Sequence, residues 1–384
     1  LRQEDHDPKH LRKVLDAAKR NVLASFIQAA FGIVNPGAEY KHNFHIEAIA
    51  HQLERCRLGE IRRLIITVPP RHLKSLCVSI AYPAFLLGND PTRRIIAASY
   101  ASDLSVDHHR LFRSVVGSRD YRRLFPRVRV GKDTENKYIT SEGGFRYATS
   151  VGGMLTGIGG TDIIIDDPLK PEDAMSKVAR EAVISWFKTT LSTRHDDKQT
   201  GTIILVMQRL HVDDLVGHIL ENEGEHWVHL DLPAIAEEPQ AVATGNGNVH
   251  KRKIGDVLHP EREPFKVLQQ QQATMGSAAF SAQYQQRPIP AEGNLIKAEW
   301  LCCYEVLPEK QSGDRIVQAW DCAAKSGELN DFSVCITFLV HKNAAYVIDV
   351  LRQKLIYPEL KKQVLAQKAR PTRCSSKTPA TGLL

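Results

Sequence analysis

One stretch near residue 70 constrains the fold more than any other part of the chain. An apolar run at 64–68 stops at two prolines, and Lys74 and Ser75 then open an apolar helical pattern. A buried strand that leads through a tight loop into a helix is the topology of a phosphate-binding loop, where backbone N–H groups, a lysine and a hydroxyl face an anion. The usual pattern has two glycines, but Val68 and Leu73 occupy both positions here. On this motif alone, an ordinary connection with a surface Lys-Ser pair is equally open.

Two acids follow the most apolar strand that the sequence predicts. Three consecutive isoleucines at 163–165 indicate a strand buried on both faces, and Asp166 and Asp167 come directly after it. Ligands of open α/β sheets bind at the carboxyl ends of the strands, so we expect these acids to lie near Lys74. In that setting Asp166 would hold Mg²⁺ through water and Asp167 would polarise the attacking water. An unremarkable Asp-Asp-Pro turn is the alternative.

A third apolar strand also ends in polar side chains. The run at 202–206 leads to Gln208 and Arg209, and a further helix is predicted to begin at Asp213 and Asp214. Polar side chains at this strand end suit a sensor of the γ-phosphate that couples hydrolysis to movement. Three successive strands therefore end in candidate chemistry at one edge of the predicted sheet.

Composition and charge are those of a soluble globular protein with an anionic partner. The 384 residues are enough for two domains, and 42% hydrophobic and 25% charged residues are ordinary proportions. A net charge of +7 and a sequence pI near 9.0 favour nucleic acid as that partner. The seven cysteines contain no C-x-x-C, which predicts a reducing, cytosolic setting. No apolar run has the length of a membrane span, so we expect no membrane contact.

The order of the predicted elements indicates two domains with a connector between them. A helical segment at 1–44, read as one amphipathic helix as far as residue 35, precedes an α/β domain with a mainly parallel sheet at 45–231. Proline and glycine are frequent at 232–313, which we expect to be an irregular connector around one glutamine-rich helix. The second domain is expected at 314–384.

The second domain begins with another strand that ends in an acid. The run at 315–320 leads to Asp321, and Asp331 stands before two further predicted strands and a helix. A β-β-β-α pattern with a strand-centred aspartate is how RNase H-like nucleases begin, and in such enzymes clustered carboxylates bind two metal ions. A structural aspartate at a strand end is equally open.

With these parts in order, the chain resembles the large terminase subunit of tailed bacteriophages, the ATP-driven motor that packages and cuts DNA. The resemblance runs from about residue 45 to about residue 368, and it rests on several sequence blocks in the right order. It explains the missing glycines, because this family commonly uses a Pro-Pro-Arg form of the phosphate loop. The blocks lie at 69–75, 99–102, 151–157, 166–168, 207–215 and 283–288.

The resemblance implies an α/β fold in which a P-loop ATPase domain of the ASCE type precedes an RNase H-like nuclease domain. It implies ATP and Mg²⁺ as cofactors, with Mg²⁺ or Mn²⁺ in the nuclease domain. In P-loop ATPases that act on nucleic acid, the segment just before the phosphate loop often touches the adenine, so Phe44 to Gln52 is a candidate for this contact, and a helix packed on the sheet edge is the open alternative. The implied nucleotide-binding residues are Pro70, His72, Leu73, Lys74 and Ser75, the implied catalytic residues are Asp167, Arg71, Gln208 and Arg209, and the implied metal ligands are Ser75, Asp166, Asp321 and Asp331.

The resemblance also implies partners and a place of action. These are double-stranded DNA, a portal protein and a small terminase subunit, with copies of the chain in a ring on the procapsid, in the cytoplasm of a bacterial host cell. Two departures from the family pattern stand out. Ile158 replaces a usual arginine, and the segment 370–384 has no acid and no strand pattern. We therefore expect an incomplete nuclease domain with little or no endonuclease activity, and we raise the hypothesis of a frameshift near Arg373.

Two other functions stay open on the sequence. The chain could be another P-loop DNA motor such as a helicase-like ATPase, which single-stranded DNA would stimulate. It could also be a prophage remnant without turnover. An ATPase assay with and without linear duplex DNA separates these alternatives.

Overall fold

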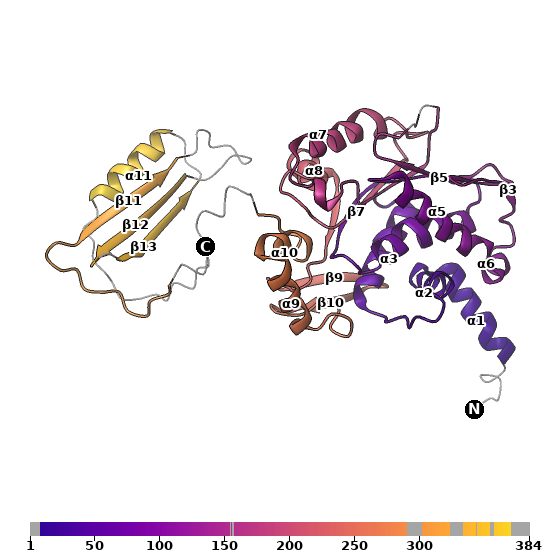
Figure 1. The fold of residues 1–384 in the computed structure, drawn as a ribbon, viewed down its shortest axis with the longest axis horizontal. Coiled ribbons are helices and arrows are strands. Elements are labelled where there is room, and N and C mark those ends of the chain that lie inside the picture. Colours follow the sequence, from indigo (N-terminus) through magenta and orange to yellow (C-terminus); the bar gives the residue numbers. More distant parts are fainter. Residues whose placement is uncertain are drawn as a thin grey trace. The chain divides into compact units, whose positions relative to one another are not determined.

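The computed structural model describes residues 8–153, 155, 157–289, 302–322, 333–342, 344–353 and 357–369. The chain forms two compact units, Leu1–Leu295 and Ile296–Leu384, and each is described by itself (Figure 1). The predicted domain boundaries at 44, 231 and 313 stay predictions. Among the described residues, no helix combines the length and the apolar character needed to cross a bilayer.

The first unit is built on an eight-stranded sheet in the order β3-β4-β5-β2-β6-β7-β1-β8. All neighbours from β5 to β8 in this order run parallel, and only the β3-β4-β5 end is antiparallel. The prediction of an α/β fold with a mainly parallel sheet is confirmed. The strands are β1 (Arg63–Thr67), β2 (Arg94–Ser99), β3 (Val130–Asp133), β4 (Lys137–Thr140), β5 (Phe145–Ser150), β6 (Asp162–Asp166), β7 (Thr202–Met207) and β8 (Val228–Asp231).

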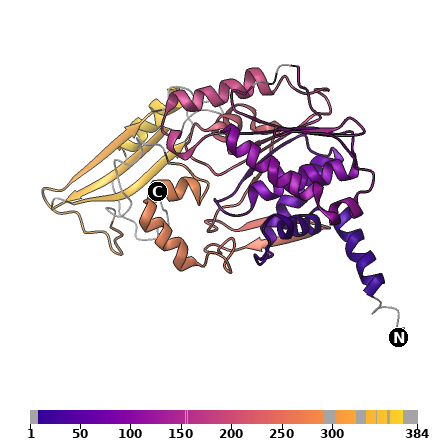
Figure 2. The ribbon, with the colours of Figure 1, turned by 45° about the vertical axis from the view of Figure 1, so that its right-hand side comes forward.

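Helices cover both faces of this sheet (Figures 1 and 2). Because successive side chains of a strand point to opposite faces, Ile164 of β6 joins one core while Ile163 and Ile165 join the other. The apolar strands are therefore buried on both sides, as the isoleucine run predicts. The first face carries α2 (Leu23–Val34), α3 (Phe44–Leu58), the π-helix η2 (Leu76–Ala81), α4 (Tyr82–Asn89), α5 (Ser102–Gly117) and α6 (Arg119–Leu124), and the second carries α7 (Lys177–Trp186), η4 (Phe187–Leu191) and α8 (Leu215–Glu223).

The prediction of one amphipathic helix before residue 35 is wrong. The structure has α1 (Pro8–Asn21) and α2, which are separated by Val22 in an extended conformation with φ −120° and ψ 113°. The two segments differ in polarity, because α1 is rich in charge whereas α2 is almost entirely apolar and lies in the core. A break between them lets α2 lie in the core while α1 keeps its charges in water.

The segment that follows β8 is more regular than the sequence indicates. The predicted glutamine-rich helix is present as α9 (Phe265–Met275), but α10 (Ser277–Gln283) and an antiparallel hairpin, β9 (Gln240–Gly245) with β10 (Asn248–Arg252), were not predicted. His250 of the hairpin stacks on Phe44 of α3 with 3.8 Å between the ring centroids. This segment is therefore part of the first unit and packs on α3.

The second unit contains a three-stranded antiparallel sheet in the order β11-β12-β13, followed by a helix. This is the predicted meander and helix, while the assignment to an RNase H-like domain stays a prediction. Residues 370–384, on which the frameshift hypothesis rests, lie outside the described residues. The elements are β11 (Arg315–Asp321), β12 (Ser333–His341), β13 (Ala344–Gln353) and α11 (Tyr357–Ala369).

Candidate functional site

The loop between β1 and η2 has a strained backbone at two residues. Arg71 has φ 64° and Leu73 has φ 61°, so both lie in the left-handed region that glycine adopts most readily. An L-residue there costs roughly 1–2 kcal/mol. Leu73 stands where the usual phosphate loop has its second glycine, and the loop keeps a left-handed conformation without it. Such strain is typical of sites where the surrounding structure holds a functional geometry.

Lys74 lies at the meeting point of three strand ends. Its Nζ is 2.9 Å from Oδ2 of Asp167 and donates to Oε1 of Gln208 at 3.2 Å. Lys74 follows β1, Asp167 follows β6 and Gln208 follows β7, the strand that lies between the other two. The parallel order of these strands therefore brings together three residues that are far apart in the sequence. The lysine is nearly buried, with 7% of its surface exposed.

Asp167 is held in place by its backbone as well as by Lys74. It has a left-handed φ of 46°, its carbonyl accepts from the N–H of Tyr100, and its Oδ1 accepts weakly from the N–H of Gln208 at 3.4 Å. Burial raises the pKa of Asp167, the Lys74 ammonium opposes this change, and the neighbouring Asp166 adds to it. A carboxylate with a raised pKa suits a proton acceptor.

The carboxylate of Asp166 contacts η2. Its Oδ2 accepts from Oγ of Ser79 at 2.6 Å and lies 3.6 Å from Nδ1 of His108, whereas its buried Oδ1 has no hydrogen-bond partner. A buried carboxylate oxygen without a partner is costly, and a bound cation would satisfy it. Within the parts of the chain that the structure covers, no three His, Cys, Asp or Glu side chains group as a metal site. Mg²⁺ does not need such a group, because it is commonly held by one or two carboxylates with substrate phosphates and water.

Ser75, the predicted metal ligand, begins the helix that follows the loop and is half-buried. The hydroxyl that actually reaches Asp166 belongs to Ser79, about one helical turn later. Among the described residues, no hydrogen bond joins Ser75 to Asp166. Ser79 was not predicted, because nothing in an apolar helical run marks one serine as an acid's partner.

A buried arginine also lies behind Asp166, and the sequence gives no signal for it. Arg146 of β5 donates to Nδ1 of His109 at 2.8 Å and to the carbonyl of Ser79 at 3.0 Å. Burial lowers the pKa of Arg146 to about 9, and Asp166 opposes this change. Burial, together with Arg146, lowers the pKa of His109 to about 3. The network fixes η2 and brings positive charge toward Asp166.

The two residues of the predicted γ-phosphate sensor, Gln208 and Arg209, have different surroundings. Gln208 contacts Lys74, but the Nε of Arg209 donates to both carboxylate oxygens of Asp214, at 3.0 and 2.9 Å. Asp214 is fully buried and caps α8 by accepting from the N–H of Gly217. The Arg209 side chain therefore holds the turn before α8, and its backbone N–H donates to Oε1 of Gln286 at 3.0 Å. Its catalytic role stays a prediction.

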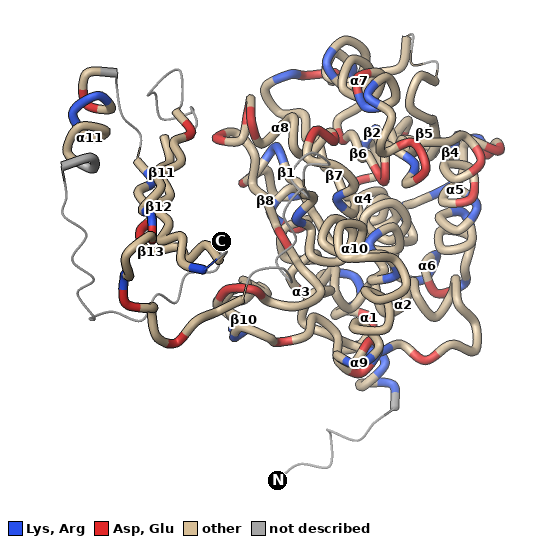
Figure 3. The backbone as a smooth tube through the Cα atoms, turned by 60° about the vertical axis from the view of Figure 1, so that its left-hand side comes forward, with Lys and Arg blue, Asp and Glu red and all other residues tan. Residues whose placement is uncertain are grey.

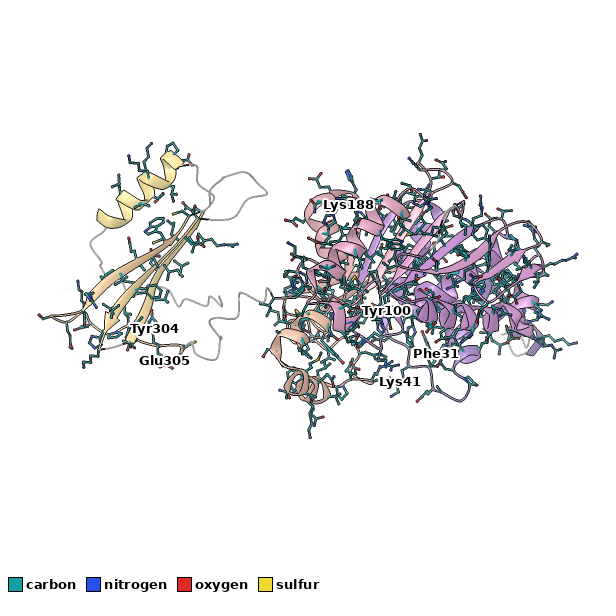
Figure 4. All side chains as sticks on the ribbon, turned by 45° about the horizontal axis from the view of Figure 1, so that its top comes forward. Phe31, Lys41, Tyr100, Lys188, Tyr304 and Glu305 are labelled. Atoms are coloured by element: carbon teal, nitrogen blue, oxygen red, sulfur yellow. The ribbon has the colours of Figure 1, made fainter. Side chains whose placement is uncertain are left out.

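A cavity of about 170 Å³ adjoins the loop. The imidazole rings of His45, His72 and His259 surround it with centroids 5.4 to 6.3 Å apart. Burial lowers the pKa of His72 to about 4 and that of His45 well below its ordinary value, so both rings are neutral at pH 7. Flat neutral rings suit a planar aromatic ligand. The remaining lining residues are Phe31, Glu39, Lys41, Leu73 and Arg262, of which Figure 4 labels Phe31 and Lys41.

The remaining predicted residues lie apart from this cluster or outside the described residues. Arg71 is exposed on the loop and Pro70 is half-buried, with its carbonyl 3.0 Å from Nδ1 of His72. Asp321 ends β11 in the second unit and is exposed. Asp331 lies outside the described residues, so the predicted nuclease metal pair stays a prediction.

Comparison with known proteins finds similar solved structures. No family model and no curated protein matches the chain. The chain is similar in structure to several large terminases of bacteriophages.

Three of the matching structures have identities of 9% to 13% and TM-scores of 0.37 to 0.44. The large terminase of bacteriophage HK97 matches with 13% identity and a TM-score of 0.44, over 91% of this chain and 71% of that one. The large terminase of a thermophilic bacteriophage in complex with ADP matches with 9% identity and a TM-score of 0.37, over 82% of this chain and 73% of that one. The large terminase ATPase domain of Thermus phage P74-26, in a mutant form, matches with 11% identity and a TM-score of 0.43, over 67% of this chain and 97% of that one.

Proposed function

We propose that this chain is the ATPase of a DNA-packaging motor, a large terminase subunit that hydrolyses ATP to move double-stranded DNA into a procapsid. The observation that carries the proposal is the position of Lys74, whose ammonium lies between Asp167 and Gln208 at the ends of three parallel strands. A buried lysine on a strand-loop-helix connection is the group that neutralises nucleotide phosphates. ATP is its proposed ligand.

The surrounding residues have roles that follow from their positions. Lys74 exchanges its contact with Asp167 for the phosphates, and the freed Asp167 orients the attacking water and accepts its proton. Gln208, whose Oε1 accepts a hydrogen bond from the same lysine, senses whether the γ-phosphate is present. Ser75 and Asp166 would hold Mg²⁺, which would supply charge neutralisation at the phosphates, and the partnerless Oδ1 of Asp166 supports this assignment. Arg71, exposed on the loop, contacts the phosphates from outside.

The histidine-lined cavity beside the loop is the proposed site of the adenine base. It is lined by Leu73 and His72 from the loop and by His45 from the segment at 44–52. A base in this cavity would have its phosphates directed along the loop toward Lys74. The neutral imidazoles can stack on the base or bond to its ring nitrogens without carrying charge into the cavity.

The proposed partners are those of a packaging motor. They are duplex DNA, a portal protein and a small terminase subunit, with copies of this chain forming a ring on the procapsid in the cytoplasm of a bacterial host. The second unit is proposed to be an RNase H-like nuclease domain in which Asp321 and Asp331 would hold Mg²⁺ or Mn²⁺. Two-metal catalysis needs further carboxylates to complete such a site.

The decisive experiment measures ATP hydrolysis by the purified chain with Mg²⁺, in the presence and absence of linear duplex DNA. The Lys74→Ala variant should lose hydrolysis by at least about a hundredfold, since it removes the buried charge that faces the phosphates. Lys198→Ala is the matched control, because this lysine is exposed on a surface turn. Hydrolysis that survives in Lys74→Ala, or that is absent from the unaltered chain, would refute the proposal.

A further inference from the structure

Two short segments hold more net positive charge than the whole chain. Residues 8–21 and 119–132 contain eleven Lys and Arg side chains and only two acids, whereas the complete chain has 51 basic and 44 acidic residues and a net charge of +7. The rest of the chain is therefore slightly acidic. Nothing in the proposed nucleotide site uses this concentration of charge, because its residues lie at the ends of β1, β6 and β7.

The fold brings these two segments together, although about a hundred residues separate them. Arg20 of α1 donates from Nε to the carbonyl of Leu124 at 2.9 Å, and Arg123 of α6 forms a two-point ion pair with Asp16 at 2.9 and 3.0 Å. Figures 1 and 2 both show α1 running along the same end of the first unit as α6. These contacts place α1 and α6 side by side, so that basic residues of both helices are neighbours.

The two acids within these segments are both engaged by the same arginine. Arg123 pairs with Asp16 of α1 and with Asp120 of its own helix at 2.7 Å. Hydrogen bonding to Arg123 lowers the pKa of Asp16, and the charges of Arg12 and Lys19 add to this change. Because Asp16 is one carboxylate among several cations, the net charge where α1 meets α6 stays positive.

The helical phase of each element keeps the other basic residues accessible. On α6, Tyr121 and Leu124 are buried in the core, so Arg119 and Arg122 lie on the opposite, exposed face. On α1, Arg12, Lys13 and Lys19 stand three or four residues from Asp16, and this spacing places them on the same face of the helix as Asp16. Figure 3 shows Lys and Arg along both helices. We call Arg12, Lys13, Lys19, Arg119, Arg122 and Arg123 the α1–α6 basic surface.

We propose that the α1–α6 basic surface binds the phosphate backbone of duplex DNA. Guanidinium and ammonium groups on two helices, with arginine in the majority, match closely spaced phosphates and need no particular base sequence. The choice of a duplex as the anion rests on the proposed packaging function. Another face of α1 exposes Leu11, Val14 and Leu15, each between 48% and 56% accessible, and phosphates do not recognise these apolar side chains.

The test measures binding of the full chain to a short fluorescent duplex by anisotropy over a series of KCl concentrations. The double variant Arg119→Gln with Arg122→Gln should bind about three- to tenfold more weakly at moderate salt. The slope of log K against log salt should become shallower by about 0.9 for each phosphate that the variant no longer neutralises. Both arginines lie outside the nucleotide site, so ATP hydrolysis without DNA should stay unchanged.

Two further double variants test whether a loss of binding is due to the charge at this surface. They distinguish it from unfolding and from the loss of any two exposed cations. Arg119→Lys with Arg122→Lys keeps the charge and should bind nearly as well as the unaltered chain. Lys251→Gln with Lys253→Gln removes two exposed cations from the β9–β10 hairpin region and should leave binding unchanged. A single-stranded probe of the same length should bind more weakly than the duplex.

Affinity and salt slope that do not change in the Gln variant would overturn the inference, as would an equal loss in the hairpin variant. Tighter binding to polyglutamate than to the duplex would also overturn it, since the surface would then fit an acidic protein. Failure of the proposed function is a separate result: Lys74→Ala would retain hydrolysis. DNA binding by Lys74→Ala should be normal, so the two proposals can fail independently.

Discussion

Two acids at the carboxyl end of a strand, Asp167 just after β6 in the first unit and Asp321 at the end of β11 in the second, have very different surroundings. Asp167 follows β6 and contacts Lys74 at 2.9 Å, and its backbone N–H and carbonyl are both hydrogen-bonded. Asp321 ends β11 and is exposed to solvent. The same local pattern, an apolar strand that ends in aspartate, thus gives a charge cluster in one unit and an exposed carboxylate in the other.

Strand direction accounts for the difference. In the parallel sheet, the carboxyl ends of β1, β6 and β7 lie at one edge, so polar residues that follow each strand become neighbours. In the antiparallel meander, Asp321 at the end of β11 pairs with Val334 near the start of β12. Chemistry gathered from strand ends therefore requires parallel neighbours, and an antiparallel meander must gather it from elsewhere.

The largest expected effect separates these two acids directly. Asp167→Asn should slow ATP hydrolysis by about 10²- to 10⁴-fold, the usual contribution of a general base. Asp321→Asn, the matched control, should leave the rate within about twofold of the unaltered chain. Steady-state hydrolysis with saturating ATP measures both. Equal losses in the two variants would break the comparison.

A smaller effect concerns the buried charge beside the nucleotide site. Arg209→Ala should destabilise the first unit by about 3–5 kcal/mol, because it leaves the fully buried Asp214 without its cation. Arg287→Ala removes an arginine whose side chain is 50% exposed and should cost less than about 1 kcal/mol. Urea unfolding followed by tryptophan fluorescence compares the two. A cost below about 1 kcal/mol for Arg209→Ala would show that this pair contributes little.

The smallest expected effect is a pH dependence that differs between the units. Burial lowers the pKa of His72 from 6.5 to about 4. The unfolded chain therefore binds more protons between these values, and the stability of the first unit should be fully present above pH 6.5 and decline as pH falls toward 4. The decline should reach on the order of 3 kcal/mol for this group.

The second unit contains an acid that should respond only under more acidic conditions. A hydrogen bond from the N–H of Gln311 and one from His341 lower the pKa of Asp314 below its ordinary 3.8, so its contribution is present above that value and is lost as pH falls through the lowered pKa. Hydrogen exchange of β1 and β12 peptides, corrected for intrinsic rates, measures each unit. His72→Asn should flatten the dependence of β1 between pH 6.5 and 4. An unchanged profile in that variant would assign the effect to other groups.

Much of the fold follows from local patterns in the sequence. The isoleucines of β6 predict a strand buried on both faces, and the spacing of strand, helix and strand predicts the parallel sheet. The same reasoning predicts that Lys74, Asp167 and Gln208 come together, because it needs only strand direction and strand ends. The split at Val22 was missed because it depends on which segment the core accepts. The β9–β10 hairpin was missed although it has a local signal, since Asn246-Gly247 between the two strands is a typical two-residue hairpin turn and both residues have a left-handed φ.

The chain by itself thus determined which strands are apolar, where they end and which polar residues follow them, because these properties are local and periodic. Only the tertiary structure decided that Ser79 contacts Asp166, that Arg146 is buried behind it and that Arg209 is paired with Asp214. The tertiary structure also placed α1 beside α6. These choices depend on helix phase and on packing between segments distant in the chain, where one turn of helix or one strand order changes the partner.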